Sequence, residues 1–122
     1  MNLDLYRDEI LSPLRRKNHT PKCEEAMWAA IQYAIARQVP AELQPLIYAL
    51  GLVYASHTGA MPSYTNSDNE TIFERFAGAV LARVLPRVTQ NQMRGAIRKM
   101  DAKRNARFLS DLALTQAPHA AE

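Results

Sequence analysis

The chain has one cysteine and few glycines, and both scarcities exclude classes of protein. Cys23 is the single cysteine among 122 residues, so no internal disulfide can form. The histidines, His19, His57 and His119, lie far apart, and none has a second ligand at the spacing of a metal site. The four glycines are scattered, so no glycine-rich loop is present to hold a phosphate. We therefore expect no metal and no cofactor.

Long apolar runs and an apolar N-terminus are also missing. The unbroken apolar run from Leu46 to Ala55 is about half of what a bilayer requires, which argues against a membrane protein. Charged residues such as Asp4 and Arg7 stand where a signal peptide needs its apolar segment. Together with the lone cysteine, these features predict a cytoplasmic location.

What the chain does contain is typical of one globular domain. Hydrophobic residues make up 48% of the sequence and charged residues 22%, a balance that does not indicate disorder. A length of 122 residues is the usual size of one domain. We expect a single helical domain over residues 1–116 and a flexible tail over 117–122.

The spacing of apolar residues predicts an all-α fold of about five helices. Helical periodicity runs through five segments, and no stretch alternates as a β-strand would. The segments lie at about 3–11, 21–38, 41–56, 68–85 and 90–114. Segments 21–38 and 41–56 are expected to form a central apolar pair, and the last two a basic C-terminal hairpin packed across it. A bend or a break near Asn105 is expected, because the apolar stripe changes side there.

Helix starts and one core position follow from local patterns. Thr20 followed by Pro21 is a typical N-cap with proline at the first helical position. Capping boxes are predicted at Ser67 to Glu70 and at Thr89 to Gln92, where a hydroxyl and a carboxyl or amide side chain are three residues apart. Cys23 falls on the apolar stripe of its segment, so we expect it in the core.

No arrangement of residues favours catalysis. Ser56 and His57 are adjacent, but neighbouring residues rarely reach each other as a nucleophile and its base, and no nucleophile elbow surrounds them. The chain is therefore predicted not to be an enzyme.

The first candidate site is a charge-free stretch from Leu43 to Ser67. Aromatic residues and methionine are enriched at protein interfaces, and charge is depleted there. Burial in the domain's own core would explain the helical part equally well. Candidate partner-binding residues are Trp28, Tyr48, Leu52, Tyr54, Met61 and Tyr64. The surplus of apolar surface also favours a homodimer.

The second candidate site is basic and lies near the C-terminus. Residues 83–107 contain eight basic side chains against Asp101, and residues 72–108 have the outline of a helix-turn-helix. A solvated helix face would explain the charge as well. The candidate nucleic-acid-binding residues are Gln90, Asn91, Gln92 and Arg94, which could read bases, and Arg98, Lys99, Lys103 and Arg107, which could meet phosphates.

The charge-free stretch departs further from an ordinary soluble surface than the basic residues do. We therefore expect a small non-enzymatic regulator that binds another cytoplasmic protein and modulates, most simply inhibits, its activity or assembly. The alternative is a helix-turn-helix DNA-binding transcriptional regulator. No motif in the sequence identifies a family.

Overall fold

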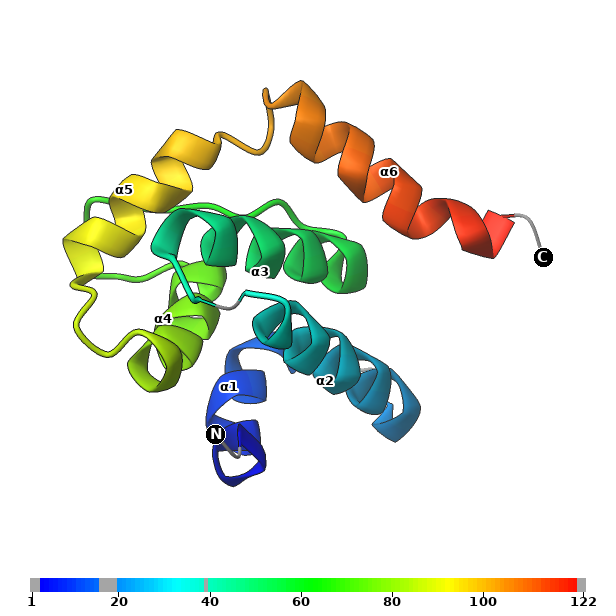
Figure 1. Cartoon of the computed structure of the whole chain (residues 1–122), viewed down its shortest axis with the longest axis horizontal. Helices are drawn as coiled ribbons and strands as arrows, with labels where there is room; N and C mark the ends of the chain where they lie inside the picture. The colour runs from blue at the N-terminus through cyan, green and yellow to red at the C-terminus, as the bar shows by residue number, and fades with distance from the viewer. Residues whose placement is uncertain (1–2, 16–19, 39, 121–122) are drawn as a thin grey trace.

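The computed structural model describes residues 3–15, 20–38 and 40–120, with side chains up to Thr115. These residues form helices and connecting segments without a strand, which confirms the all-α prediction (Figure 1). The elements, in chain order, are the 3-10 turn η1 (Leu3–Tyr6), α1 (Arg7–Leu11), the 3-10 turn η2 (Ser12–Leu14), α2 (Pro21–Ala36), α3 (Leu43–Thr58), α4 (Ile72–Val84), α5 (Gln90–Met100) and α6 (Ala106–Ala120). The described part therefore has six α-helices rather than about five.

Helix α2 starts as predicted but does not bury its cysteine. The Thr20 hydroxyl accepts a hydrogen bond from the Cys23 backbone N–H at 3.1 Å, and Pro21 occupies the first helical position. Cys23 is exposed, so its predicted place in the core was wrong. The buried stripe of α2 begins one turn later, at Met27, because the first turn extends beyond the helices on which α2 packs (Figure 1).

The predicted capping box at Ser67 to Glu70 was also wrong. Helix α4 begins four residues later, where the Thr71 hydroxyl accepts from the Glu74 N–H at 3.0 Å and the Glu74 carboxylate accepts from the Thr71 N–H at 2.8 Å. Ser67 instead hydrogen-bonds within the preceding loop. The two boxes have the same residue spacing, so only the position of the core selects between them.

The second capping box and the predicted break near Asn105 are confirmed. Thr89 and Gln92 exchange hydrogen bonds of 3.1 and 2.8 Å at the start of α5. The helix ends at Asp101, whose φ of 41° lies in the left-handed region. The Asn105 side chain then accepts from the N–H groups of Arg107 and Phe108 and starts α6. Of the two expected alternatives the chain has the break, which accounts for the sixth helix.

The end of α6 lies at the limit of the described residues. The helix is assigned to Ala120, and the last two residues of the chain fall outside the described part. The flexible tail expected over 117–122 stays a prediction.

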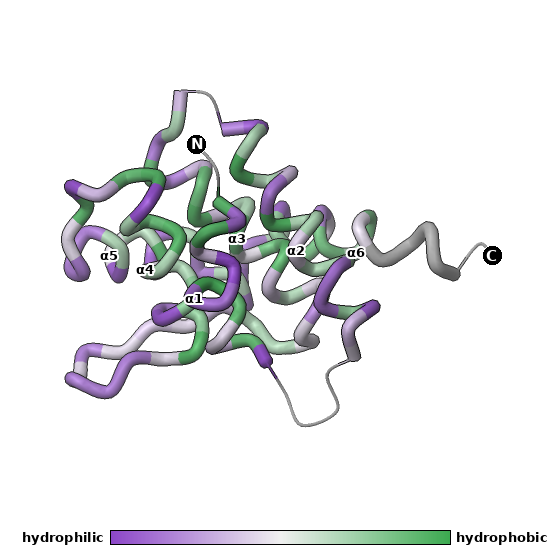
Figure 2. Tube along the Cα trace, turned by 90° about the horizontal axis from the view of Figure 1, so that it is seen from below, coloured by the Kyte–Doolittle hydropathy of each residue, from purple (hydrophilic) through white to green (hydrophobic). Residues whose placement is uncertain are grey.

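Helix α3 is the centre of the fold, since it contacts α2, α4, α5 and α6. Its buried face carries Leu46, Ile47, Leu50 and Tyr54. The Tyr54 ring lies 5.1 Å from Phe73 and 6.3 Å from Phe76, both fully buried on α4. The tube in Figure 2 turns hydrophobic where α1, α3 and α4 meet. These neighbours explain the apolar residues of α3 that face the core.

Glycine at position 51 permits a close approach between α3, the loop after it and α5. A Cβ atom there would lie 3.1 Å from Cγ of Pro62 and 3.1 Å from Cε of Met100. Pro62 is buried, so the charge-free loop is held against α3 at this point. Within the described residues, every helix is too short or too polar to cross a bilayer.

Candidate partner-binding groove

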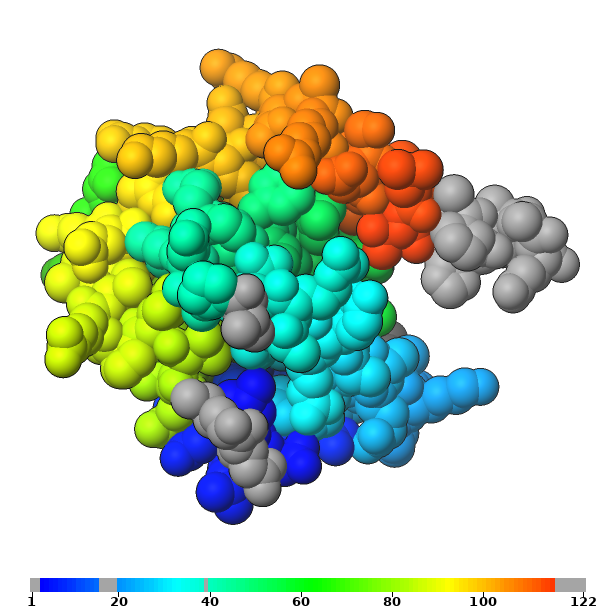
Figure 3. Space-filling model, viewed as in Figure 1, coloured from blue at the N-terminus to red at the C-terminus, as the bar shows by residue number. Residues whose placement is uncertain are grey.

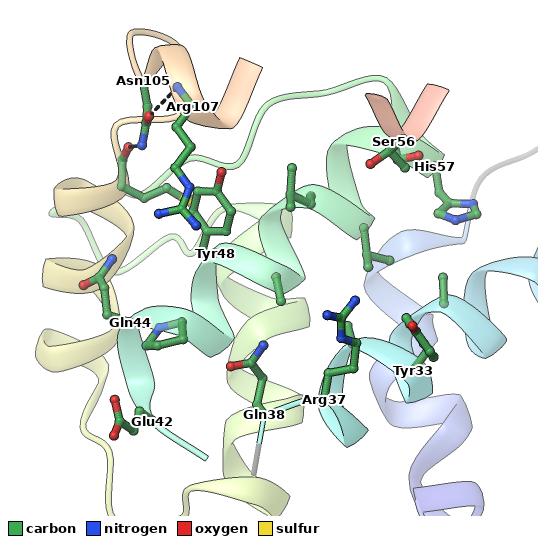
Figure 4. A pocket seen from close by; sticks show the side chains of 18 of the residues that line it. Tyr33, Arg37, Gln38, Glu42, Gln44, Tyr48, Ser56, His57, Asn105 and Arg107 are labelled. Carbon is green, nitrogen blue, oxygen red and sulfur yellow. Dashed lines mark hydrogen bonds between the residues drawn. The ribbon is translucent and has the colours of Figure 1, made fainter. Parts of the chain in front are cut away.

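A groove runs along the face of α3 that the core does not use. It has a volume of about 1200 Å³, and it lies between α2 on one side and α6 with the end of α5 on the other (Figures 3 and 4). Figure 3 shows this face hollowed between α2 and α6. The groove therefore follows from the break at Asp101, which lets α6 stand apart from α5.

The floor of the groove is made of small and apolar side chains. On α2 these are Ala30 and Ala34, four residues apart and so on one side of the helix. On α3 they are Pro45, Ala49, Leu52 and Val53. Leu52 and Val53 are half-buried, packed against the core below and open to the groove above. Small residues in both helices keep the floor shallow.

The rim of the groove carries aromatic rings and cations. On α2, the Arg37 guanidinium lies 5.5 Å from the centre of the Tyr33 ring, which is 64% exposed. Opposite it, Arg107 of α6 lies 5.5 Å from the centre of the Tyr48 ring. Lys99 adds a third cation from the end of α5, and Figure 4 shows Arg37 and Arg107 on opposite sides of α3. The groove thus combines an apolar floor with a basic rim.

One turn of α6 fixes the second wall of the groove to α3. Phe108 is fully buried, and its ring meets Tyr48 edge to face at 5.6 Å between centres. The Tyr48 hydroxyl donates a hydrogen bond to the Asp111 carboxylate, and Arg107 approaches the same carboxylate at 3.8 Å. Burial, followed by the hydrogen bond to Asp111, raises the pKa of Tyr48 to about 12. The hydroxyl therefore remains a donor well into the alkaline range.

The structure brings only two of the predicted partner-binding residues into this groove, Tyr48 and Leu52. The prediction of a partner-binding role was wrong for Trp28 and Tyr54, since they are 3% and 5% exposed. The Trp28 indole N–H donates to Asp4 at 3.0 Å, and Tyr54 packs against the phenylalanines of α4. Both side chains belong to the protein's own core, so they are too buried to contact a partner.

Met61 and Tyr64 lie in the loop between α3 and α4 and do not line the groove. Met61 is half-buried against the core, and Tyr64 is 40% exposed. Sequence reasoning missed the contribution of α2, namely Tyr33, Arg37 and the two alanines. The spacing of Ala30, Tyr33, Ala34 and Arg37 on one side of the helix was the available signal.

The predicted nucleic-acid-binding residues have several different surroundings. The prediction that Arg94 reads bases was wrong, because its guanidinium is bonded within the protein. Its Nε lies 2.5 Å from the fully buried Glu74 carboxylate, and its Nη2 donates to the Ser67 carbonyl at 2.9 Å. Gln92 is exposed, but its side-chain oxygen caps α5. Lys99 and Arg107 line the groove. Gln90, Asn91, Arg98 and Lys103 are exposed.

Ser56 and His57 lie near one end of the groove (Figure 4). Among the residues that the structure describes, no three His, Cys, Asp or Glu side chains are grouped closely enough to hold a metal ion. A scan against protein-family models finds no match, and searches of curated proteins and of solved structures find no significant match.

Proposed function

We propose that this chain is a small non-enzymatic regulator that binds another cytoplasmic protein through the groove on α3 and inhibits that protein's activity or assembly. The observation that carries the proposal is the open, apolar floor of the groove. Apart from the buried Ala34, its residues are half-buried or exposed, and they are apolar although they lie on the surface of a small domain.

The size and openness of the groove favour a macromolecule over a small ligand. Small-molecule sites are clefts or cavities of roughly 300–1,000 Å³ that bury most of the ligand's surface. This groove, at about 1200 Å³, lies along helices and opens along its length (Figure 3). Apolar surface of this kind on a soluble protein commonly marks an interaction site.

A pull-down from the native host, with and without nuclease, tests the proposal. We expect the wild-type chain to capture a protein that nuclease does not release. Leu52→Lys places a charge on the groove floor and should abolish capture, whereas Lys103→Glu, an exposed change outside the groove, should not. Capture that survives Leu52→Lys would move the binding site away from the groove.

Self-association is a separate part of the proposal. Leu109 and Leu114 on α6 are 40% and 67% exposed, and a two-fold dimer would cover such residues. A dimer of two 13.7 kDa chains should then sediment at about 27 kDa. Persistence of the dimer in Leu52→Lys would leave the groove available to a different protein, whereas its loss would assign the groove to the dimer.

Binding of duplex DNA is the second candidate function, and one observation favours it. Arg87, Arg98, Lys103 and Arg104 are all exposed, and so are Gln90 and Asn91 at the start of α5. Neutralising Arg98 and Lys103 together should then weaken duplex binding and reduce its salt dependence, because fewer counterions are released. Arg94 is unsuitable for this test, since its loss would disturb the buried Glu74. Micromolar or tighter duplex binding at physiological salt, unaffected by Leu52→Lys, would favour this function over the first.

A further inference from the structure

We propose that the occupant of the groove is an amphipathic helix of the partner protein whose flanks carry carboxylates. This inference rests on the proposed function and specifies the partner's chemistry.

The backbone chemistry of the walls favours a helical occupant. Every wall of the groove is a helix or a helix end, so most of its backbone N–H and C=O groups already pair within helices. An extended peptide would find no strand edge among the described residues and would leave its own backbone groups without partners. A helix satisfies its backbone internally and needs only side-chain contacts from the groove.

The floor also has the shape that a helix requires. Ala30 with Ala34 on α2, and Pro45, Ala49 and Val53 on α3, recur every four residues along the two sides of the floor. Small side chains at this spacing form a groove into which the ridge of another helix can pack. The occupant would then lie beside α2, α3 and α6 as one more member of the bundle.

The charges on the rim specify the flanks of that helix. Arg37 stands on one side, and Lys99 and Arg107 stand on the other, whereas the lining residues of the described chain include one carboxylate, Glu42. The nearby Asp111 is bonded to Tyr48 and lies 3.8 Å from Arg107, whose side chain is still 83% exposed. Guanidinium groups on both sides match carboxylates placed on both flanks of an apolar stripe.

The same charges argue against the basic helices of a second copy of this chain as the occupant. The exposed helix surfaces around α5 and the start of α6 are basic, with Arg98, Lys103 and Arg104 among them. These surfaces would bring cations to a cationic rim, which is unfavourable. A different protein with an acidic helix is the better match.

A displayed library of helical peptides tests the inference on the full chain. Each peptide would have about 18 residues, or five turns, with a seam of Ala and Leu and either Glu or Lys at every flanking position. We expect selection on the wild-type chain to enrich Glu on both flanks. Selection on Arg37→Glu with Lys99→Glu should shift the preference toward Lys.

Affinities of the selected peptides then locate the site. Ala49→Trp fills the floor and should abolish binding, whereas Ala82→Trp, the same substitution at an exposed position of α4, should leave the affinity unchanged. Arg37→Glu alone should weaken binding of a Glu-flanked peptide by about tenfold.

Several outcomes would overturn the inference: enrichment of Lys, no charge preference, no enriched helical peptide at all, or equal binding to Ala49→Trp and Ala82→Trp. A failure of this inference can also be distinguished from a failure of the proposed function. If Leu52→Lys loses the native partner while the library shows no preference for Glu, the groove still binds a protein and only the acidic helix is wrong.

Discussion

The two faces of α3 have similar composition and different roles. The face with Leu46, Ile47, Leu50 and Tyr54 is 5% exposed or less at every position. The opposite face, with Pro45, Tyr48, Ala49, Leu52 and Val53, forms the groove. The contrast shows that an apolar stretch can divide between a core and an open groove within one helical turn. Apolarity alone therefore does not assign a residue to either.

The largest expected effect comes from the ion pair between Arg94 of α5 and Glu74 of α4, in which Arg94 also holds the loop before α4 at Ser67. Arg94→Met removes the partner of a fully buried carboxylate and releases the Ser67 carbonyl. Removing one member of such a pair costs about 3–5 kcal/mol. Urea denaturation should show this loss. The double variant Arg94→Met, Glu74→Gln should lose much less stability than the sum of the losses in the two single variants. Additive losses would mean that the two side chains act independently.

Two leucines of α3, one on each face, provide a matched test of the difference between the core face and the groove face. Leu50→Ala removes a fully buried side chain and should destabilise the fold by about 2–5 kcal/mol. Leu52→Ala removes a half-buried one from the groove floor and should cost about 1 kcal/mol. Equal shifts of the denaturation midpoint would mean that the groove face is packed as tightly as the core.

A smaller effect on stability is expected at Gly51, where α3 meets the loop that follows it. Gly51→Ala gains helix propensity but forces the new methyl group against the rigid Pro62 ring and the flexible Met100 side chain. Because the proline cannot move aside, we expect a net loss of about 1 kcal/mol. Gly95→Ala is the control, since a Cβ there meets no atom within 4 Å and should stabilise α5. A gain at both positions would show that the loop yields at Pro62.

The smallest effect concerns the attachment of α6 to the groove face. Tyr48→Phe removes the hydrogen bond to Asp111 and should cost about 1 kcal/mol at neutral pH.

The pKa of Tyr48 also makes this attachment pH-dependent. The folded chain holds the Tyr48 proton up to about pH 12, whereas the unfolded chain releases it near pH 10. The folded state thus binds more protons in that window, and its stability should fall as the pH rises from 10 to 12. Phenolate absorbance should show a step near pH 12 that Tyr48→Phe lacks. An unchanged titration in the variant would contradict this assignment.

Much of the fold could be predicted from the sequence because the signals are local. The caps at Thr20 and Thr89 and the break near Asn105 each depend on a few neighbouring residues. Ser67 and Thr71 show where local signals fail, because two valid capping boxes lie four residues apart and the packing of Phe73 and Phe76 chooses between them.

The candidate site was less predictable, since it depends on which side of each helix meets a neighbour. Trp28 and Tyr48 look alike in the sequence, yet α1 and η1 cover the first, while α6 leaves the second at the edge of a groove. Arg94 belongs to a basic run but pairs with Glu74, twenty residues earlier. Such pairings are tertiary and carry no local pattern.

The break at Asp101 to Asn105 also places one wall of the groove and most of the core on different helices. Helix α6 packs chiefly on α3 and is anchored there by the turn around Phe108. The core formed by α1, α3 and α4 does not depend on the outward residues of α6. Substitutions at the outward residues of α6, such as Arg107, can therefore reshape one wall of the groove while the core keeps its packing.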